Sequence, residues 1–217
     1  MNPLHPRDQE YFDQYPEPIM RSLQDIHFTN INSTIPYFGP ILYFLIRQFG
    51  CEQVLEVGHA EGYTSYYMAN GVKDNAIRFG MAGNRYYGID IVQTDKVREQ
   101  LLAKDLPVTL INMDSMTLSK DTFPEIVFDL VFIDGNHDKE HILHEFTTLW
   151  PQVKGEGKGH IVLHDVYGPG EEGCQAVLDK LKIENTSVEF IRLGGMYGLL
   201  IIRKMEGYKP ELWKWND

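Results

Sequence analysis

Apolar and polar residues alternate along this chain in a pattern that predicts a strand–helix repeat from residue 51 onward. Short apolar runs, each ending in or beside an acidic residue, alternate with stretches of helical periodicity. Nearly continuous apolar strands between helices are typical of a parallel sheet that is covered on both faces. The predicted strands are 53–57, 86–90, 108–114, 127–134 and 160–165, and the predicted helices are 64–70, 94–104, 115–121, 137–149 and 173–181.

The pattern differs on either side of this repeat and once within it. A helix is expected to begin after Ser33/Thr34 and to end just before Gly50, and the glycine-bearing residues 71–85 are expected to form a long connection. Glycines between the apolar runs 188–193 and 197–203 predict a tight connection between antiparallel neighbours. We therefore expect an α/β fold with a doubly wound, mostly parallel seven-stranded sheet whose last strand is antiparallel.

The composition fits one domain with a sizeable core. The chain has 217 residues, of which 43% are hydrophobic and 12% aromatic, and these values are far from those of disordered chains. We expect three parts: a lead segment with a helix at 1–50, which we consider as a lid over a substrate, a ligand-binding domain at 51–203 and a tail at 204–217.

Charge and cysteine content argue against several classes of protein. The formal net charge is −11, which repels polyanions, so we expect no nucleic-acid partner. The two cysteines, Cys51 and Cys174, cannot form a disulfide framework, and the longest apolar stretch, 41–46, is too short to span a bilayer. We expect a cytoplasmic protein that acts on a small molecule without a membrane partner, and we leave homo-oligomerisation open.

Acidic residues stand at or near the carboxyl ends of five predicted strands. The carboxyl ends of parallel strands meet at one edge of the sheet, where ligands bind in doubly wound folds. Together these acids predict a negative rim that suits a cation, a metal ion or a ligand rich in hydroxyl groups. They are Glu56, Asp90, Asp114, Asp134 and Asp165.

The loop after the first predicted strand is the most informative segment. Gly58 permits a tight turn there, and Gly62 permits close approach of the backbone to a ligand. A dinucleotide fingerprint would instead have three glycines in the spacing G-x-G-x-x-G. Glu56 would repel a pyrophosphate, but it would attract a sulfonium ligand that carries an ammonium group. The alternative is a plain strand–helix turn that binds nothing.

Asp90, at the end of the second predicted strand, stands where an acid accepts hydrogen bonds from ribose hydroxyls in nucleotide-binding folds. The position follows directly from the apolar run Tyr86–Ile89. The alternative is that the Asp90 carboxylate caps the helix that follows, because aspartate is a preferred residue at helix N-termini.

Taken in order, these segments resemble the motifs of class I S-adenosylmethionine-dependent methyltransferases. The spacing Glu56-x-Gly58-x-x-x-Gly62 resembles their first motif, Asp90 resembles the acid that holds the ribose, and Met113-Asp114-Ser115 resembles the segment beside the adenine. The resemblance implies S-adenosyl-L-methionine as the cofactor, with Glu56, Gly58, Gly62, Asp90, Asp114 and Ser115 binding it.

A narrower resemblance concerns the fourth and fifth predicted strands. The run from Phe132 to His137 reads F-I-D-G-N-H, and His164-Asp165 ends the next strand. These two segments are similar to a branch of small-molecule O-methyltransferases that carries an F-I-D-G-x-H motif and includes macrolide sugar and cephamycin-type enzymes. Taken together, the resemblance covers about residues 51–203.

The same two strand ends predict a metal site. Asp134 and Asp165 end strands that this fold places side by side, and carboxylate oxygens suit Mg²⁺ or Mn²⁺. Relatives in the branch often end the fifth strand in Glu-Asp, whereas here His164 precedes Asp165, and imidazole favours a softer divalent ion. We expect Asp134, His164 and Asp165 as ligands. The alternative is that the two acids cap helices and line the pocket without a metal.

Histidine titrates near neutrality, so His137 is our candidate for the base that accepts the proton of a substrate hydroxyl, with Asp134 as the second catalytic residue. The predicted function is S-adenosylmethionine-dependent O-methylation of a small-molecule hydroxyl with the help of a divalent metal. Two alternatives stay open: metal-independent N- or O-methylation, and a non-catalytic binding module on the same fold. His141 and His144 are expected on the solvated surface of the helix.

Overall fold

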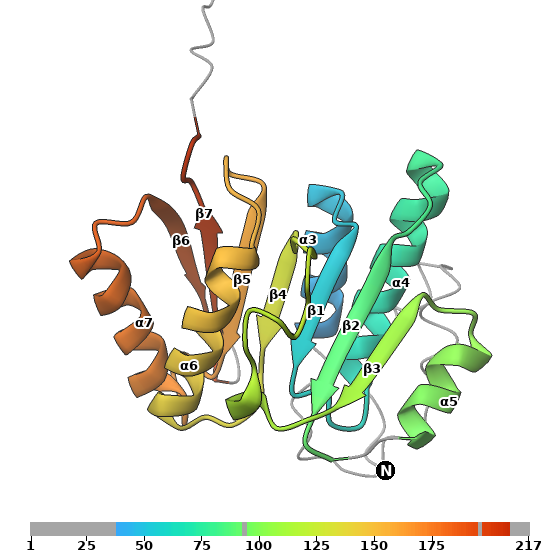
Figure 1. Ribbon diagram of the computed structural model, residues 1–217, viewed down its shortest axis with the longest axis horizontal. Helices are drawn as coiled ribbons and strands as arrows, with labels where there is room; N and C mark the ends of the chain where they lie inside the picture. The colour runs from blue at the N-terminus through green and yellow to red at the C-terminus, as the bar shows by residue number, and fades with distance from the viewer. Residues whose placement is uncertain (1–37, 93–94, 195–196, 209–217) are drawn as a thin grey trace, which may run out of the picture. The chain divides into compact units, whose positions relative to one another are not determined.

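The structure, a computed structural model, describes residues 38–92, 95–194 and 197–208, and within these residues a mixed sheet of seven strands forms the centre of the fold (Figure 1). The strand order is β3-β2-β1-β4-β5-β7-β6. The strands are β1 (Gln53–Val57), β2 (Arg85–Asp90), β3 (Val108–Asn112), β4 (Leu130–Ile133), β5 (Gly159–His164), β6 (Val188–Leu193) and β7 (Leu199–Lys204).

Strand pairing confirms the predicted mixed sheet. The pairs β1–β2, β1–β4, β2–β3 and β4–β5 are parallel, and β7 pairs antiparallel with both β5 and β6. The sequence order reverses at β1, which lies between β2 and β4, so the loops after β1 and β4 diverge from one place at the carboxyl edge of the sheet. This is where ligands bind in doubly wound folds.

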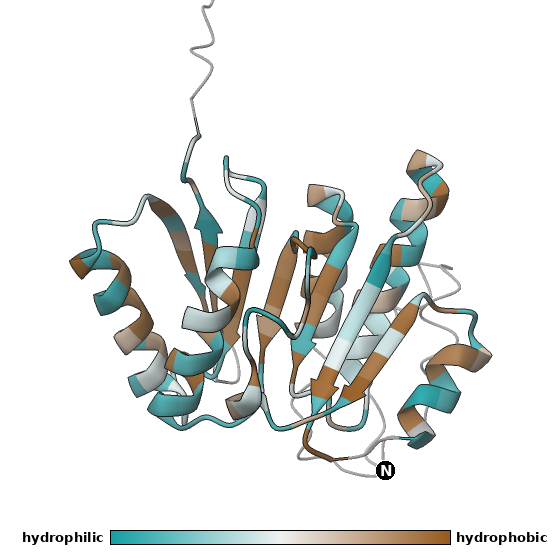
Figure 2. Cartoon of the chain, in the orientation of Figure 1, coloured by the Kyte–Doolittle hydropathy of each residue, from teal (hydrophilic) through white to brown (hydrophobic). Residues whose placement is uncertain are grey.

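Helices cover both faces of the sheet, with α3 and α4 on one face and α6 and α7 on the other (Figure 1). Most of them carry an apolar side and a polar side, as the mixture of brown and teal in Figure 2 shows. In α6, for example, Ile142, Phe146 and Leu149 are buried at helical spacing against the sheet. The helices are α3 (Phe38–Phe49), α4 (Tyr63–Phe79), α5 (Asp95–Ala103), α6 (Lys139–Leu149) and α7 (Glu171–Ile183).

The long connection predicted at 71–85 is wrong, because α4 continues through Gly71 to Phe79 and only the last part of the segment is a loop. Gly71 allows this helix to pack closely against α3. A Cβ atom there would lie 2.8 Å from the Ile46 side chain, so the missing side chain lets α3 and α4 approach closely. Asn75 adds hydrogen bonds of 2.9 Å to the carbonyl oxygens of Ile46 and Cys51. Tertiary packing thus outweighs the low helix propensity of glycine.

The helix predicted at 115–121 is also wrong, because only one 3-10 turn forms there, η1 (Ser115–Thr117). Leu118 leaves helical geometry with ψ at 135°, and the backbone N–H of Ser119 then donates to the Thr122 hydroxyl. Local side-chain bonds of this kind compete with helix formation. The strand predicted at 127–134 is shorter than expected, since Phe128 forms only an isolated bridge with Val153.

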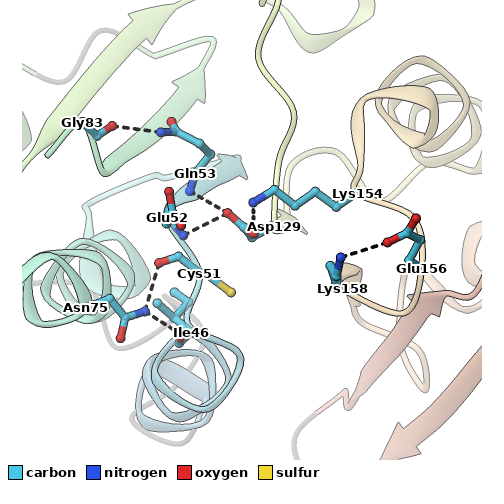
Figure 3. A network of polar contacts seen from close by, with 10 residues as sticks. All are labelled: Ile46, Cys51, Glu52, Gln53, Asn75, Gly83, Asp129, Lys154, Glu156 and Lys158. Atoms are coloured by element: carbon cyan, nitrogen blue, oxygen red, sulfur yellow. Dashed lines mark hydrogen bonds and ion pairs between the residues drawn. The ribbon is translucent and has the colours of Figure 1, made fainter. Parts of the chain in front are cut away.

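Asp129 stabilises the sheet at the edge opposite the carboxyl ends of the parallel strands (Figure 3). One carboxylate oxygen accepts from the backbone N–H groups of Glu52 and Gln53, both at 2.9 Å, and the other lies 2.6 Å from the Lys154 ammonium. A buried acid with three donors stabilises the register of β1 against β4. Within the described residues, no helix is long and apolar enough to cross a membrane.

Candidate active site

A pocket of about 390 Å³ lies at the carboxyl ends of β1 to β4. Each of these strands contributes wall residues directly after its last residue or at its end, and His141 of α6 completes the wall. Five of the residues predicted from the sequence line this pocket together: Gly58, Asp90, Asp114, Ser115 and Asp134. The remaining predicted residues, Glu56, Gly62, His137, His164 and Asp165, lie outside its lining.

Two glycines shape the loop between β1 and α4. Gly58 and Gly62 have φ values of 84° and 81°, a left-handed conformation that glycine adopts without strain. A Cβ atom on Gly58 would collide with the Asp134 carbonyl oxygen, and one on Gly62 would collide with Val97 of α5. The absence of a side chain at Gly58 therefore brings the β1 loop into contact with the β4 loop, and residues of both loops line the pocket.

Glu56 lies beneath this loop and is fully buried. Its carboxylate accepts hydrogen bonds from the hydroxyls of Thr64 and Tyr86 and, at 2.6 Å, from Ser65. Burial raises the pKa of Glu56 to about 7, although the three hydroxyls oppose this change. The acid thus ties β1 to the first turn of α4 and to β2. That Glu56 attracts the ammonium group of a cofactor stays a prediction.

Asp90 reaches from the end of β2 to the same loop. One oxygen accepts from the backbone N–H of Ala60 at 2.8 Å, and the other accepts from that of Val92 at 2.8 Å. Ala60 and Val92 both lie before the start of α5, so these bonds are not those of a cap on that helix. Each carboxylate oxygen has two lone pairs, so the side chain keeps acceptor capacity toward the pocket.

Asp114 and Ser115 form the wall after β3. Asp114 Oδ1 accepts from the backbone N–H of Met116 at 2.9 Å, and the Thr117 hydroxyl donates to the Asp114 carbonyl at 2.6 Å. These bonds hold the turn η1, in which Ser115 is the first residue. The second oxygen of the Asp114 carboxylate is available to a donor in the pocket.

An acid–histidine cluster joins the ends of β4 and β5. His164 Nδ1 lies 2.9 Å from Asp134 Oδ1 and 3.0 Å from Asp165 Oδ1, yet neither contact has the alignment of a ring N–H hydrogen bond. One donor atom from each residue lies within 4.8 Å of the others. Phe38 meets the His164 ring edge-on at 5.2 Å and holds it in place. Asp134 is the member that lines the pocket.

The two carboxyl groups that face His164 differ in acidity. Burial raises the pKa of Asp134, and His164 only partly offsets this change. Burial would raise the pKa of Asp165 too, but the imidazoles of His137 and His164 beside its carboxylate hold it well below its usual range. Although burial favours neutral imidazole, the two acids raise the pKa of His164 to about 9. The cluster therefore favours a cation at its centre, whether a proton or a metal ion.

His137 precedes α6 and pairs with the end of β5. Its Nδ1 lies 2.8 Å from Asp165 Oδ2, and 40% of its side chain is exposed. The hydrogen bond that His137 donates to Asp165 raises the pKa of His137, and burial opposes this rise. A histidine that donates from Nδ1 to a carboxylate presents the lone pair of Nε2, which is the atom that can accept a proton. The predicted base is thus oriented by a predicted metal ligand.

Sequence reasoning missed two polar residues of α6. His141 was expected on the solvated helix surface, and this expectation is wrong for His141, because it lines the pocket and its Nε2 lies 3.3 Å from the Asn136 amide nitrogen. Glu145, one turn later, is fully buried. The four-residue spacing of the two places them on one face of the helix, and that signal could have found them.

Comparison with known proteins identifies the family. Residues 55–166, just over half of the chain, match the family model described as a methyltransferase domain. The chain belongs to this methyltransferase family. The match begins within β1 and includes the pocket loops and the acid–histidine cluster through Asp165, so the prediction that the chain is a methyltransferase enzyme is confirmed. No curated protein matches the sequence significantly.

Several solved structures share the fold of this methyltransferase. The SAH-bound methyltransferase PaMTH1 from Podospora anserina is 19% identical, with a TM-score of 0.65, and the match covers 94% of this chain and 98% of that one. The O-methyltransferase from Bacillus cereus, in complex with SAH, is 18% identical, with a TM-score of 0.65 and coverage of 91% and 97%. The O-methyltransferase TomG from Streptomyces achromogenes, in complex with SAM, is 18% identical, with a TM-score of 0.63 and coverage of 92% and 96%. These similarities confirm the predicted Rossmann-like methyltransferase fold.

Proposed function

We propose that this methyltransferase transfers a methyl group from S-adenosylmethionine to a hydroxyl group of a small molecule, with the help of a divalent cation. One observation carries the proposal: the same pocket is lined by Asp90, the acid expected to bind a ribose, and by Asp134, the first member of the acid–histidine cluster. The pocket supplies a place for the methyl donor, and the cluster supplies groups that activate an acceptor. Solved structures of the same fold hold SAM or its product SAH.

The strand order supports one direction for the cofactor in the pocket. Asp90 ends β2, with β3 on one side and β1 and β4 on the other. A nucleoside whose ribose hydroxyls donate to Asp90 extends its base toward Asp114 and Ser115 after β3. Its sulfonium end then lies toward Gly58 and Asp134. In this direction the methyl group would lie beside the cluster, next to the proposed site of the acceptor.

The residues of the cluster fit a divalent cation. Two carboxylates and one imidazole offer donor atoms within 4.8 Å of one another, and the contacts of His164 Nδ1 are close without being aligned hydrogen bonds. Asp134, His164 and Asp165 would hold the ion, and the imidazole favours Mn²⁺ or a later transition metal over Mg²⁺. A bound divalent cation lowers the pKa of a hydroxyl and orients it.

The chain's own residues then carry out the proton transfer. His137 Nε2 accepts the hydroxyl proton of the acceptor while the oxygen forms a bond to the methyl carbon. The bond between this carbon and sulfur breaks, and its electron pair stays on sulfur as a neutral thioether. Asp165 holds the imidazole by its bond to Nδ1 and stabilises the imidazolium that forms. Displacement at carbon needs an in-line approach, so positioning by the pocket supplies much of the rate.

Calorimetry and a transfer assay test the proposal together. The protein should bind S-adenosylhomocysteine and not NAD, and it should transfer labelled methyl groups from S-adenosylmethionine to members of a panel of phenols and sugar alcohols. The assay is repeated with amine acceptors and with chelator. Transfer that persists in chelator would favour the metal-independent alternative, and binding without transfer to any acceptor would favour the binding module. Preference for NAD would overturn the proposal.

A further inference from the structure

Glu145 is an exception on the buried face of α6. It is fully buried, and neither of its carboxyl oxygens has a hydrogen-bond partner among the described residues. The other residues buried on this helix, Ile142, Phe146 and Leu149, are apolar. Burying a polar group without a partner destabilises a fold, so a leucine here would pack at a lower cost. An acid at this position therefore calls for an explanation outside core packing.

The carboxyl group points at the back of the pocket wall. A Cβ atom built on Gly135 would lie 3.4 Å from Glu145 Oε1, so the acid lies directly behind this residue. Burial raises the pKa of Glu145 to about 7, and the hydroxyl of Ser115 lies near enough to oppose that rise. Gly135 and Ser115 both line the pocket, as does His141 one turn earlier on the same helix.

The turn η1, which contains Ser115, is held by hydrogen bonds that do not involve Glu145. Asp114 accepts from the backbone N–H of Met116, and the hydroxyl of Thr117 donates to the Asp114 carbonyl. These bonds fix the backbone of η1 within itself. They do not attach it to α6. An acceptor behind Ser115 is placed to make that attachment, because the serine hydroxyl is a donor that can rotate toward it.

We propose that Glu145 is a positioning residue that accepts a hydrogen bond from the Ser115 hydroxyl when the cofactor is bound, and thereby sets the wall that selects adenine. The inference rests on the proposed function, which places the base at Asp114 and Ser115. With Ser115 held from behind, its backbone N–H and the free oxygen of Asp114 face the base edge. A 6-amino base donates to the carboxylate there, whereas a 6-oxo base presents an acceptor to it.

Two nucleosides that differ only at this edge test the inference: S-adenosylhomocysteine and S-inosylhomocysteine. Calorimetry gives both dissociation constants, and the selectivity ratio is the dissociation constant of S-inosylhomocysteine divided by that of S-adenosylhomocysteine. Glu145→Leu removes the acceptor and should lower the ratio by about tenfold, since one hydrogen bond is involved. Ser115→Ala should lower it by the same factor, and the double variant should lower it no further. Glu145→Gln keeps an acceptor oxygen and should keep the ratio. Glu140→Gln, on the exposed side of α6, is the matched control.

The outcomes separate the inference from the proposed function. A ratio unchanged in Glu145→Leu, or equal weakening of both nucleosides, would overturn the positioning role while leaving the cofactor assignment intact. Additive effects of the two single variants would also overturn it. If the parent protein bound neither nucleoside, the proposed function would fail and the inference with it. Ser115 is only half-buried, so Ser115→Ala decides the matter if Glu145→Leu does not fold.

Discussion

His137 Nδ1 lies 2.8 Å from Asp165 Oδ2, which joins the loop before α6 to the end of β5. The same aspartate contacts His164 Nδ1 through its other oxygen, at 3.0 Å. Asp165 has a positive φ of 61°, an unusual conformation for a residue with a side chain, and it places the carboxylate between the two rings. Asp165 therefore contacts both the proposed base, His137, and the proposed metal ligand His164.

Loss of the proposed base should slow the chemical step. His137→Gln removes the proton acceptor while keeping a polar side chain, and kcat should fall by roughly 10²–10⁴-fold, the usual contribution of a general base. Affinity for S-adenosylhomocysteine should stay within about twofold, because the base acts on the acceptor. Steady-state kinetics and calorimetry measure the two effects. His144→Gln, a change outside the pocket lining, is the control. Equal activity of His137→Gln and parent would contradict the assignment.

Removal of divalent cations should stop methyl transfer, and Mn²⁺ or Mg²⁺ should restore it. Asp134→Asn should weaken Mn²⁺ binding, measured by electron paramagnetic resonance, and should lower kcat far more than cofactor affinity, since the ion acts on the acceptor. Asp138→Asn changes an exposed acid four residues further on and should leave Mn²⁺ binding unchanged. Unaltered Mn²⁺ binding by Asp134→Asn would remove this residue from the ligand set.

Asp90→Ala should weaken binding of S-adenosylhomocysteine by about 1.5–3 kcal/mol, the usual value for hydrogen bonds to a charged group. The variant also loses the bonds to the backbone N–H groups of Ala60 and Val92, so the loop loses part of its support. Calorimetry measures the affinity, and circular dichroism checks the fold. Asp95→Ala removes a nearby exposed acid that pairs with Arg98 and should bind like the parent. Equal affinity of the Asp90 variant would place the ribose elsewhere.

Gly58→Ala tests the contact between the β1 and β4 loops. The new Cβ atom would be strained at a φ of 84° and would collide with the Asp134 carbonyl oxygen. The variant should lose about 3 kcal/mol of unfolding free energy, from strain and overpacking together, and should lose cofactor binding. Denaturant titration and calorimetry measure the two losses.

Gly83→Ala is the matched control for this glycine. Its φ of 94° imposes the same kind of strain, but a Cβ atom there meets nothing within 4 Å. It should lose only about 1–2 kcal/mol, the cost of a left-handed conformation, and should bind the cofactor like the parent. Equal losses in the two variants would show that the close loop contact has no part in the effect of Gly58→Ala.

His160, at the start of β5, should make the protein sensitive to acid. It is buried and stacks on Phe49 with 4.1 Å between ring centroids, and burial lowers its pKa from 6.5 to about 4. Between pH 6.5 and about pH 4, His160 is protonated in the unfolded chain but neutral in the folded chain. Stability should therefore fall as the pH drops from 6.5 toward 4, by about 3 kcal/mol in total.

His160→Phe should remove this dependence. Neither ring nitrogen of His160 has a hydrogen-bond partner among the described residues, so a phenyl ring gives up no bond and keeps the stacking on Phe49. Denaturant titrations at pH 7 and pH 4.5 compare the two proteins, and the difference between their unfolding free energies should grow with acidity. A constant difference would mean that His160 is protonated in the fold.

The sequence alone determined the sheet and the chemistry available at its edge. Apolar runs that end in or beside Glu56, Asp90, Asp114, Asp134 and Asp165 predicted the strands, because a parallel sheet buried on both faces requires near-continuous apolar segments. The spacing of Gly58 and Gly62 predicted the loop, because a left-handed backbone favours glycine. These local constraints act within a few residues, so one sequence suffices to detect them.

Only the tertiary structure decided how these residues divide the work. Glu56 stands in the first motif, yet its carboxylate faces Tyr86 of the neighbouring strand, and no local pattern encodes that contact. The course of α4 through Gly71 depends on the approach of α3. The direction of a buried side chain depends on which element packs against it, and this holds for Glu145 behind Ser115 as well. Packing between distant segments is a property of the whole chain, and a pattern of neighbouring residues does not contain it.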